Sequence, residues 1–222
     1  MRYARFSLVA GCGLSRGLHV WMVAILAALG WENARAEEAG FESLFDGKSL
    51  AGWKANENPE SWKVIDGQIV CHGPRSHLFF ISSDATQPAL FKNFDFKAEV
   101  MTKPGANSGI FFHTKFQPQG WPAQGYEMQV NNSQSDPVRT GSLYNVVKNF
   151  LAPAKDDAWF TQEVIVEGKR ITVKVDDRTL FEFVEPDGVT GTRKLSDGTF
   201  ALQAHDPGSV VYYKNLRVKR LP

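Results

Sequence analysis

An all-β fold is predicted for residues 37–222 by three features of the sequence. Short apolar or alternating runs follow one another from Phe41 to the C-terminus, and clusters of Gly, Pro, Asn and Asp separate them. No apolar pattern of helical period continues for more than two turns. About a dozen short strands in one compact domain require two packed sheets or a barrel, because each strand must bury its apolar face.

The first predicted strands lie between residues 62 and 101. Segments 62–65 and 68–71 flank Asp66-Gly67, a dipeptide that strongly favours a two-residue β-hairpin turn. Segment 77–81 is a short, mostly apolar run, and segment 94–101 alternates apolar and polar residues as a half-buried strand does. All four segments are therefore predicted as strands.

Eight further strands are expected along the rest of the chain. Three short runs, 109–114, 126–131 and 142–147, come first, and two others, 199–205 and 210–217, come last. Between them, segments 160–167, 170–175 and 179–184 alternate and are separated by Glu167-Gly168-Lys169 and Asp176-Asp177-Arg178. Three alternating runs with short polar turns predict an antiparallel meander with one buried face.

The loops between the predicted strands indicate one domain. Segments 116–124 and 147–158 are the longest stretches without strand character and are rich in Pro, Gly and polar residues. Loops of this kind at the rim of a sheet commonly carry binding groups. Residues 37–222 contain no internal repeat or linker that would mark a second domain.

Residues 1–36 are predicted to be a signal peptide. Leu18 to Gly30 is an apolar run of the length of a signal-peptide core, basic residues precede it, and Ala34-Arg35-Ala36 offers a small-x-small cleavage site. The run is shorter than the roughly 20 residues that a membrane span requires. We therefore expect a periplasmic or secreted protein. A lipoprotein with Cys12 lipidated is the less favoured alternative, because the apolar stretch before Cys12 is short.

The balanced charge argues against nucleic acid and acidic membranes as partners, and the cysteine content argues against an internal disulfide. The 25 basic residues balance the 24 acidic ones, so we expect neither nucleic acid nor an acidic membrane surface as a partner. We also expect no stable membrane insertion once residues 1–36 are removed. Cys71 is the one cysteine after the leader, so no internal disulfide can form, and it is interpreted as a small buried residue of a strand.

Polar side chains recur at every second position on three of the predicted strands. Glu127 and Gln129 share one face of their strand, as do Gln203 and His205, while Asn107, Phe111 and His113 share a face of the third. A solvent-exposed face would give the same pattern. If the three strands are neighbours, however, they form a polar and aromatic floor whose amides, carboxylate and imidazole can bind sugar hydroxyls and move a proton.

A sugar site also needs an aromatic platform for the apolar C–H face of the ring. Trp121, in the loop just before the Glu127 strand, is the candidate; a partly buried loop anchor is the alternative interpretation. Ordinary glycoside hydrolysis requires two carboxylates, yet the position next to Glu127 on the same face is Gln129. Glu163 could face Glu127 only if the fold brought it there.

No metal or cofactor is expected from the sequence. The histidines lack zinc-binding spacing, and nucleotide-binding glycine loops and Gly-x-Ser-x-Gly elbows are absent. A divalent metal held by Glu127, His205 and water is the alternative that the sequence leaves open.

Motifs along residues 41–222 together resemble one known family, the 3-keto-disaccharide hydrolase domain family. They are, in order, Phe45-Asp46-Gly47-Lys48-Ser49-Leu50 with Gly52-Trp53, Trp62-Lys63-Val64 with Asp66-Gly67, Phe94-Asp95-Phe96 with Glu99, Asn107-Ser108-Gly109-Ile110, Gly125-Tyr126-Glu127-Met128-Gln129, Thr140-Gly141-Ser142-Leu143-Tyr144, Leu202-Gln203-Ala204-His205 and Lys214-Asn215-Leu216-Arg217. The number and order of these motifs make the resemblance specific.

The resemblance implies a two-sheet antiparallel β-sandwich, jelly-roll and concanavalin A-like, with one concave face. It also implies an exported enzyme, a hydrolase or lyase, that cleaves 3-keto-glycosides and 3-keto-disaccharides. A ketone at carbon 3 acidifies the proton on carbon 2, so one base can start an elimination without a second carboxylate. Glu127 and His205 are the expected catalytic pair, with the roles of base and acid open between them.

The expected substrate-binding residues of this oxidised-sugar site are Asn107, His113, Trp121, Gln129, Tyr144 and Gln203. His113 stands where members of the family usually carry Arg after the Asn-Ser-Gly-Ile run. That departure leaves a second function open: a non-catalytic, lectin-like carbohydrate-binding module on the same fold.

Overall fold

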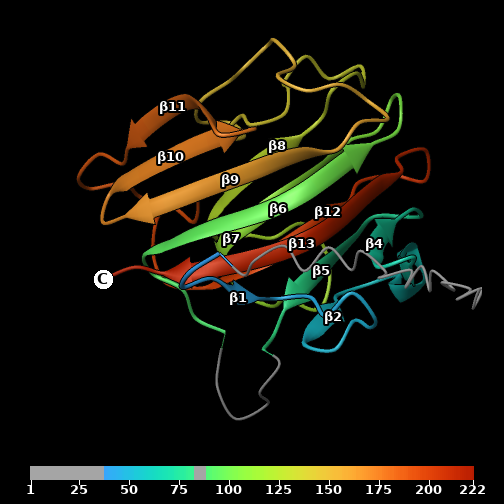
Figure 1. Ribbon diagram of the computed structural model, residues 1–222. Helices are drawn as coiled ribbons and strands as arrows, with labels where there is room; N and C mark the ends of the chain where they lie inside the picture. The colour runs from blue at the N-terminus through green and yellow to red at the C-terminus, as the bar shows by residue number, and fades with distance from the viewer. Residues whose placement is uncertain (1–37, 83–88) are drawn as a thin grey trace, which may run out of the picture. The chain divides into compact units, whose positions relative to one another are not determined.

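The computed structural model describes residues 38–82 and 89–222, which form a sandwich of two antiparallel sheets (Figure 1). The predicted signal peptide, residues 1–36, lies outside the described residues. Within these two ranges a single short 3₁₀-helix, η1 (Pro59–Ser61), accompanies the strands, and no helix is long and apolar enough to cross a membrane.

The larger sheet has eight strands in the order β11-β10-β9-β6-β13-β4-β3, with β1 paired to β13. Their bounds are β1 Glu42–Ser43, β3 Trp62–Ile65, β4 Gln68–Cys71, β6 Phe94–Thr102, β9 Phe160–Glu167, β10 Arg170–Val175, β11 Arg178–Val184 and β13 Val211–Arg220. The predicted hairpin is β3–β4, and the predicted meander is β9–β10–β11 at one side of the sheet. Both predictions are confirmed.

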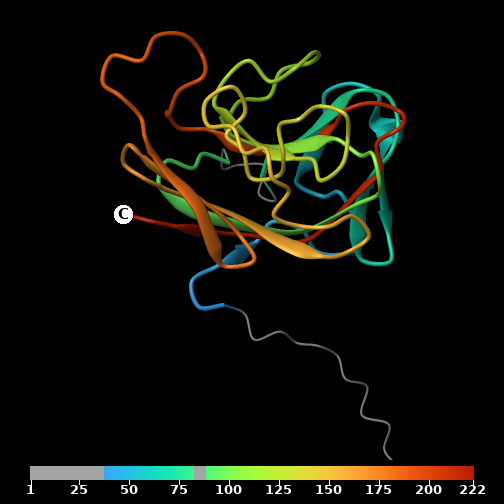
Figure 2. The ribbon, with the colours of Figure 1, turned by 90° about the horizontal axis from the view of Figure 1, so that it is seen from above.

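The smaller sheet has five strands in the order β2-β5-β12-β7-β8. Their bounds are β2 Trp53–Ala55, β5 Ser76–Phe80, β7 Ser108–Thr114, β8 Tyr126–Val130 and β12 Thr199–Ala204. Figure 2 shows the two sheets as two layers, with the smaller sheet in the upper part of the picture and long loops on its outer side. The three strands with polar residues at period two, β12, β7 and β8, are neighbours, which meets the condition for a shared polar floor.

Alternation on the strands places the core between the two sheets. Met128 and Val130 of β8 and Leu202 of β12 point inward, so their strand neighbours Glu127, Gln129 and Gln203 point to the outer face of the smaller sheet. Aromatic rings fill the centre: Phe200 stacks on Phe96 with centroids 4.4 Å apart and meets the ring of Phe94 edge-on at 5.0 Å. Cys71 is fully buried in this core, and burial raises the pKa of its thiol to about 12.

Two details of the predicted strands are wrong. Segment 142–147 is not a strand: Asn145 adopts φ 61°, and Val147 N–H returns to the carbonyl of Leu143 at 2.9 Å, so the chain turns back on itself. The short strands β1 and β2 were missed because two and three residues are too few to show a period.

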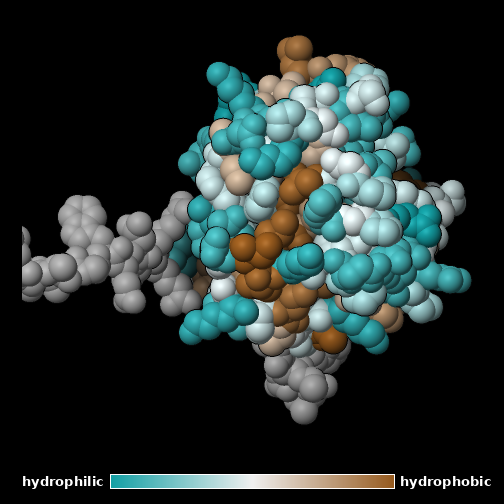
Figure 3. Space-filling view, turned by 90° about the vertical axis from the view of Figure 1, so that its right-hand side faces the viewer, coloured by the Kyte–Doolittle hydropathy of each residue, from teal (hydrophilic) through white to brown (hydrophobic). Residues whose placement is uncertain are grey.

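The face of the molecule presented in Figure 3 is mainly hydrophilic and is crossed by one narrow strip of hydrophobic residues. Large apolar side chains also reach solvent, for example Phe150, which is 60% exposed in the loop after β8. Exposed apolar side chains of this kind are common on folded domains.

Truncating the aromatic centre of the core should destabilise the domain strongly. Phe200→Ala removes contacts with several buried rings, so we expect the free energy of unfolding to fall by ~3–5 kcal/mol. Phe150→Ala, at the exposed position, should change it by less than ~0.5 kcal/mol. Urea denaturation of both variants, followed by tryptophan fluorescence, measures the difference; equal effects would contradict the described core.

Candidate active site

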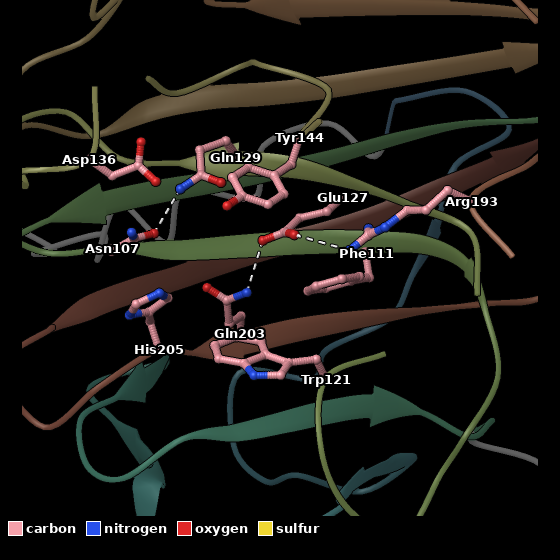
Figure 4. Close-up of a pocket in the computed structure, with 10 residues that line it drawn as sticks. All are labelled: Asn107, Phe111, Trp121, Glu127, Gln129, Asp136, Tyr144, Arg193, Gln203 and His205. Carbon is pink, nitrogen blue, oxygen red and sulfur yellow. Dashed lines mark hydrogen bonds and ion pairs between the residues drawn. The ribbon is translucent and has the colours of Figure 1, made fainter. Parts of the chain in front are cut away.

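A pocket on the outer face of the smaller sheet brings the polar residues of β7, β8 and β12 together (Figure 4). Its volume of about 190 Å³ is below the roughly 300 Å³ at which pockets for drug-sized ligands begin, so it suits one sugar ring. The residues that line it are Asn107, Phe111, Trp121, Glu127, Gln129, Asp136, Tyr144, Arg193, Gln203 and His205. Seven of the eight predicted site residues therefore line one pocket, and the eighth, His113, does not line it.

Glu127 lies on the floor of the pocket and reaches across a neighbouring strand. Its Oε1 accepts a hydrogen bond of 2.9 Å from Nε2 of Gln203, although β7 runs between β8 and β12. This reach depends on Gly109 of β7, because a Cβ atom there would lie 2.4 Å from Oε1 of Glu127. The glycine of the Asn-Ser-Gly-Ile motif thus makes room for the carboxyl group.

Burial makes the carboxyl group of Glu127 an unusually weak acid. The residue is 5% exposed, and loss of hydration raises its pKa to about 7, although Arg193 and the Gln203 amide act to lower it. A carboxyl group with this pKa exchanges protons near neutral pH. It can therefore act as a base or an acid where an exposed glutamate would be fully ionised.

Two amides extend the floor beside Glu127. Gln129 donates from Nε2 to Oδ1 of Asn107 at 2.7 Å, and both side chains are buried. The backbone of Asn107 is held by Oγ of Ser209, which accepts its N–H at 2.9 Å. These bonds fix both amides in orientations that leave other polar atoms for a ligand's hydroxyl groups.

His205 follows directly after β12 and stands at the rim. Its Nδ1 is 2.8 Å from Oδ2 of Asp206, which also accepts a hydrogen bond from Oγ of Ser209 at 2.9 Å. Partial burial would raise the pKa of Asp206, but these hydrogen bonds outweigh it and lower that pKa. The carboxylate fixes the imidazole by its Nδ1 side, which leaves Nε2 for the pocket.

Trp121 forms an exposed aromatic wall next to His205. Its ring is 43% exposed, and its centroid lies 5.5 Å from the ring of His205 and 5.2 Å from that of His77. His77 is on β5, between β2 and β12 in the sheet, and burial lowers its pKa to about 3. A neutral imidazole therefore supports the tryptophan from below.

Arg193 enters the pocket from the loop between β11 and β12. One of its guanidinium nitrogens, Nη2, lies 4.0 Å from Oε2 of Glu127, and the guanidinium carbon lies 5.8 Å from the ring centroid of Phe111. Figure 4 shows the guanidinium group turned toward Glu127. Nothing in the sequence pattern singled out this residue, because a loop has no period from which its side chains can be placed.

A second carboxylate, Asp136, also lines the pocket and was missed for the same reason. Its Oδ1 accepts the N–H of Val138 at 2.8 Å within its own loop. Glu163, the acid that the sequence left open as a partner, lies instead on β9 of the other sheet, where Lys174 contacts it at 3.3 Å. Tyr144 completes the wall, held by its N–H to the carbonyl of Glu127 at 2.9 Å.

The prediction that His113 shares the face of Phe111 is wrong. Between Phe111 and Thr114, β7 has one residue more than the opposing segment of β12, so the strand bulges, and His113 adopts φ 54°. Its ring meets Phe94 edge-on, Nε2 bonds the carbonyl of Lys92 at 2.9 Å, and Nδ1 accepts the N–H of Ser196 at 3.2 Å. His113 therefore ties two loops together on the far side of the sheet.

No group of three or more His, Cys, Asp or Glu side chains arranged to hold a metal occurs within residues 38–82 and 89–222. Glu127 and His205 line the same pocket, together with the carboxylate of Asp136.

Residues 40–219 match the family described as the 3-keto-alpha-glucoside-1,2-lyase-like domain. The chain belongs to this family. Members of this 1,2-lyase-like family are carbohydrate-active domains, as the sequence motifs implied. A 3-keto-disaccharide hydrolase from Bacteroides thetaiotaomicron is 32% identical over 78 residues, which is 33% of this chain and 27% of that relative. The match thus spans about a quarter of the length of the relative.

Solved structures share the fold of this family member. A protein from Parabacteroides distasonis, provisionally assigned as a glycosyl hydrolase, superposes with a TM-score of 0.70 at 23% identity, covering 82% of this chain and 94% of that one. The carbohydrate-binding module CBM66 from Bacillus subtilis gives 0.54 at 14% identity, covering 76% and 96%. These similarities confirm the predicted jelly-roll sandwich.

Replacing Glu127 by glutamine should stabilise the protein at alkaline pH. The native state holds the Glu127 proton up to about pH 7, whereas the unfolded state releases it near pH 4.5, so wild-type stability falls as the pH rises between these values. We expect Glu127→Gln to exceed the wild type by ~3 kcal/mol at pH 8 and by less than ~1 kcal/mol at pH 5. Urea denaturation at both pH values tests this, with the exposed Glu60→Gln as a control; a pH-independent difference would refute the buried-acid interpretation.

Proposed function

We propose that this domain cleaves 3-keto-glycosides, including 3-keto-disaccharides, by removing the proton on carbon 2 and expelling the group on carbon 1. The observation that carries the proposal is the pairing, in one pocket of single-ring size, of a buried carboxyl group with a pKa of about 7 and an imidazole oriented by a carboxylate. Carbon acids next to a ketone need a base of this strength in a water-poor site.

Glu127 is the base in this proposal. Its carboxylate takes the proton from carbon 2, and the C–H electron pair becomes the carbon 2–carbon 3 double bond of an enolate. The enolate then re-forms the ketone while a double bond forms between carbons 1 and 2 and the bond from carbon 1 to the leaving oxygen breaks. Water adds to carbon 1 of this unsaturated ketone and gives one proton to His205, which lost its own to the leaving oxygen, while Glu127 returns its proton to carbon 2, which completes a hydrolysis.

His205 is the acid in this proposal. The His205 imidazole gives a proton to the leaving oxygen, and Asp206, which bonds Nδ1, orients the ring for this transfer. Trp121 stands beside His205, so an apolar face of the leaving group can stack on it. The amides of Asn107, Gln129 and Gln203, with Tyr144, would hold the remaining hydroxyls.

We also propose that the protein acts after export, in the periplasm or outside the cell. This proposal rests on the leader-like residues 1–36 of the sequence. An oxidised sugar is then the partner of the site, and we assign it no nucleic acid.

Substrate pairs separate the two catalytic roles. We expect the wild type to cleave a 3-keto-glucoside but not the unoxidised glucoside, and Glu127→Gln to lose ~10²–10⁴-fold in rate on every ketone substrate. His205→Ala should lower the rate by the same factor when the leaving group is a sugar. It should lower the rate little when the leaving group is nitrophenolate, which needs no proton to leave. Product release followed by chromatography measures all three, with Glu60→Gln as control.

The same assay distinguishes the alternatives. Binding of the sugar without turnover of either substrate would establish a lectin-like module in place of the enzyme. Cleavage of the unoxidised glucoside by the wild type would instead point to Glu127 and Asp136 acting as an ordinary glycosidase pair. A parallel assay with chelator tests whether a divalent metal takes part.

The pH dependence of the reaction should follow Glu127. Because the base must be ionised and its pKa is about 7, kcat/KM for a 3-keto-glucoside should rise tenfold per pH unit below pH 7 and level off above it. Initial rates between pH 5 and pH 9 measure this, with a nitrophenyl leaving group to remove the contribution of His205. A plateau that already begins near pH 4.5 would contradict the assignment.

A further inference from the structure

Arg193 brings a positive charge and an unoccupied hydrogen-bond donor to the pocket. Its Nη1 is buried and has no hydrogen-bond partner among the residues that the structure describes, while Nη2 lies 4.0 Å from Oε2 of Glu127. A buried donor without a partner is costly, by roughly 1–3 kcal/mol, so its presence at a pocket points to a ligand atom that accepts from it.

We propose that Arg193 binds the oxygen on carbon 3 of the sugar and stabilises the enolate that forms there, which makes Arg193 the residue that selects oxidised sugars. This inference rests on the proposed function. The inference assigns a catalytic role to Arg193, which is neither the acid nor the base of the proposed mechanism.

The loop holds Arg193 in place on both sides. The carbonyl of Thr192 accepts the N–H of Gly125 at 3.1 Å. On the other side, the N–H of Leu195 donates to Oε2 of Glu185 at 2.7 Å, and that of Ser196 donates to His113. The guanidinium itself lies over the ring of Phe111 on the pocket floor. A cation fixed before the substrate binds stabilises developing charge without reorganisation.

The order of the groups across the pocket matches the order of the reacting atoms. Arg193 contacts Glu127 on one side, and Gln203 binds Glu127 on the side toward His205 and Trp121, as Figure 4 shows. In the substrate, the carbon 3 oxygen is next to carbon 2, and carbon 1 with its leaving group follows. Oxygen 3 at Arg193 therefore puts carbon 2 at Glu127, the leaving oxygen at His205 and the leaving group on Trp121.

The proton transfer balances with these residues alone. The Glu127 carboxylate gains the carbon 2 proton, the C–H pair forms the new carbon–carbon double bond, and the former carbonyl pair moves to oxygen 3, where it faces the Arg193 guanidinium. An unoxidised sugar carries a hydroxyl at carbon 3, has no acidic proton on carbon 2 and develops no charge at Arg193. Specificity for the ketone therefore follows from the same contact as catalysis.

Exchange of the carbon 2 hydrogen of 3-keto-glucose with D₂O tests the inference without the leaving-group step. We expect the wild type to catalyse this exchange and Arg193→Gln to be slower by ~10²–10³-fold, the usual loss for one oxyanion donor. Proton NMR measures the rate from pH 6 to pH 9 against a sample without enzyme. Lys194→Gln removes a neighbouring charge from the same loop and should exchange like the wild type.

The pH series separates stabilisation of the enolate from an effect on Glu127. Arg193 also lowers the pKa of Glu127, so Arg193→Gln shifts the onset of exchange to higher pH. If this were its only role, the exchange rate would recover fully at pH 9, and that result would overturn the inference while leaving the proposed function intact. If the exchange rate of Arg193→Gln levels off at high pH well below that of the wild type, and added guanidinium partly rescues Arg193→Ala, the inference is supported. Absence of exchange in the wild type would overturn the proposed function itself.

Discussion

The hydrogen bond between Glu127 and Gln203 is the interaction on which the pocket depends. It joins β8 to β12 across the intervening strand, and it exists because Gly109 leaves the space above β7 free. Glu127 and Gln203, which are 76 residues apart in the sequence, thereby share one buried polar contact. The carboxyl group is held away from solvent, which raises its pKa, and it faces the centre of the pocket.

Burying so many polar groups on one sheet face is unfavourable unless they bind one another. The sheet meets this requirement in pairs: Gln129 donates to Asn107, and Gln203 donates to Glu127. Two buried atoms at the pocket still have no hydrogen-bond partner within the described chain, Oε1 of Gln203 and Nη1 of Arg193. Residues that would weaken an ordinary sheet are thus retained at a site where a ligand can complete their bonds.

The sequence predicted those members of the site that lie on regular strands. Alternation is a strict property of an extended chain, so Glu127, Gln129 and Gln203 could be assigned to one face, and His205 directly follows β12. The prediction for His113 was wrong because a bulge between Phe111 and Thr114 interrupts the alternation. Asp136 and Arg193 could not be found in this way, since their loops are shaped by long-range bonds such as that from Gly125 to Thr192.

The contacts of His113 fix the loop that carries Arg193 independently of the strands that carry Glu127 and Gln203. Its ring fastens the loop that carries Arg193 to the segment around Lys92, from behind the sheet and without touching the pocket. In the proposed mechanism, Glu127 of β8 and His205, directly after β12, transfer the protons, whereas Arg193 binds the negative charge from a loop that is fixed at its base. Residues 186–194 of this loop can therefore be exchanged for other sequences, which changes the charged wall of the pocket, while the sheet beneath keeps the geometry of the pocket floor.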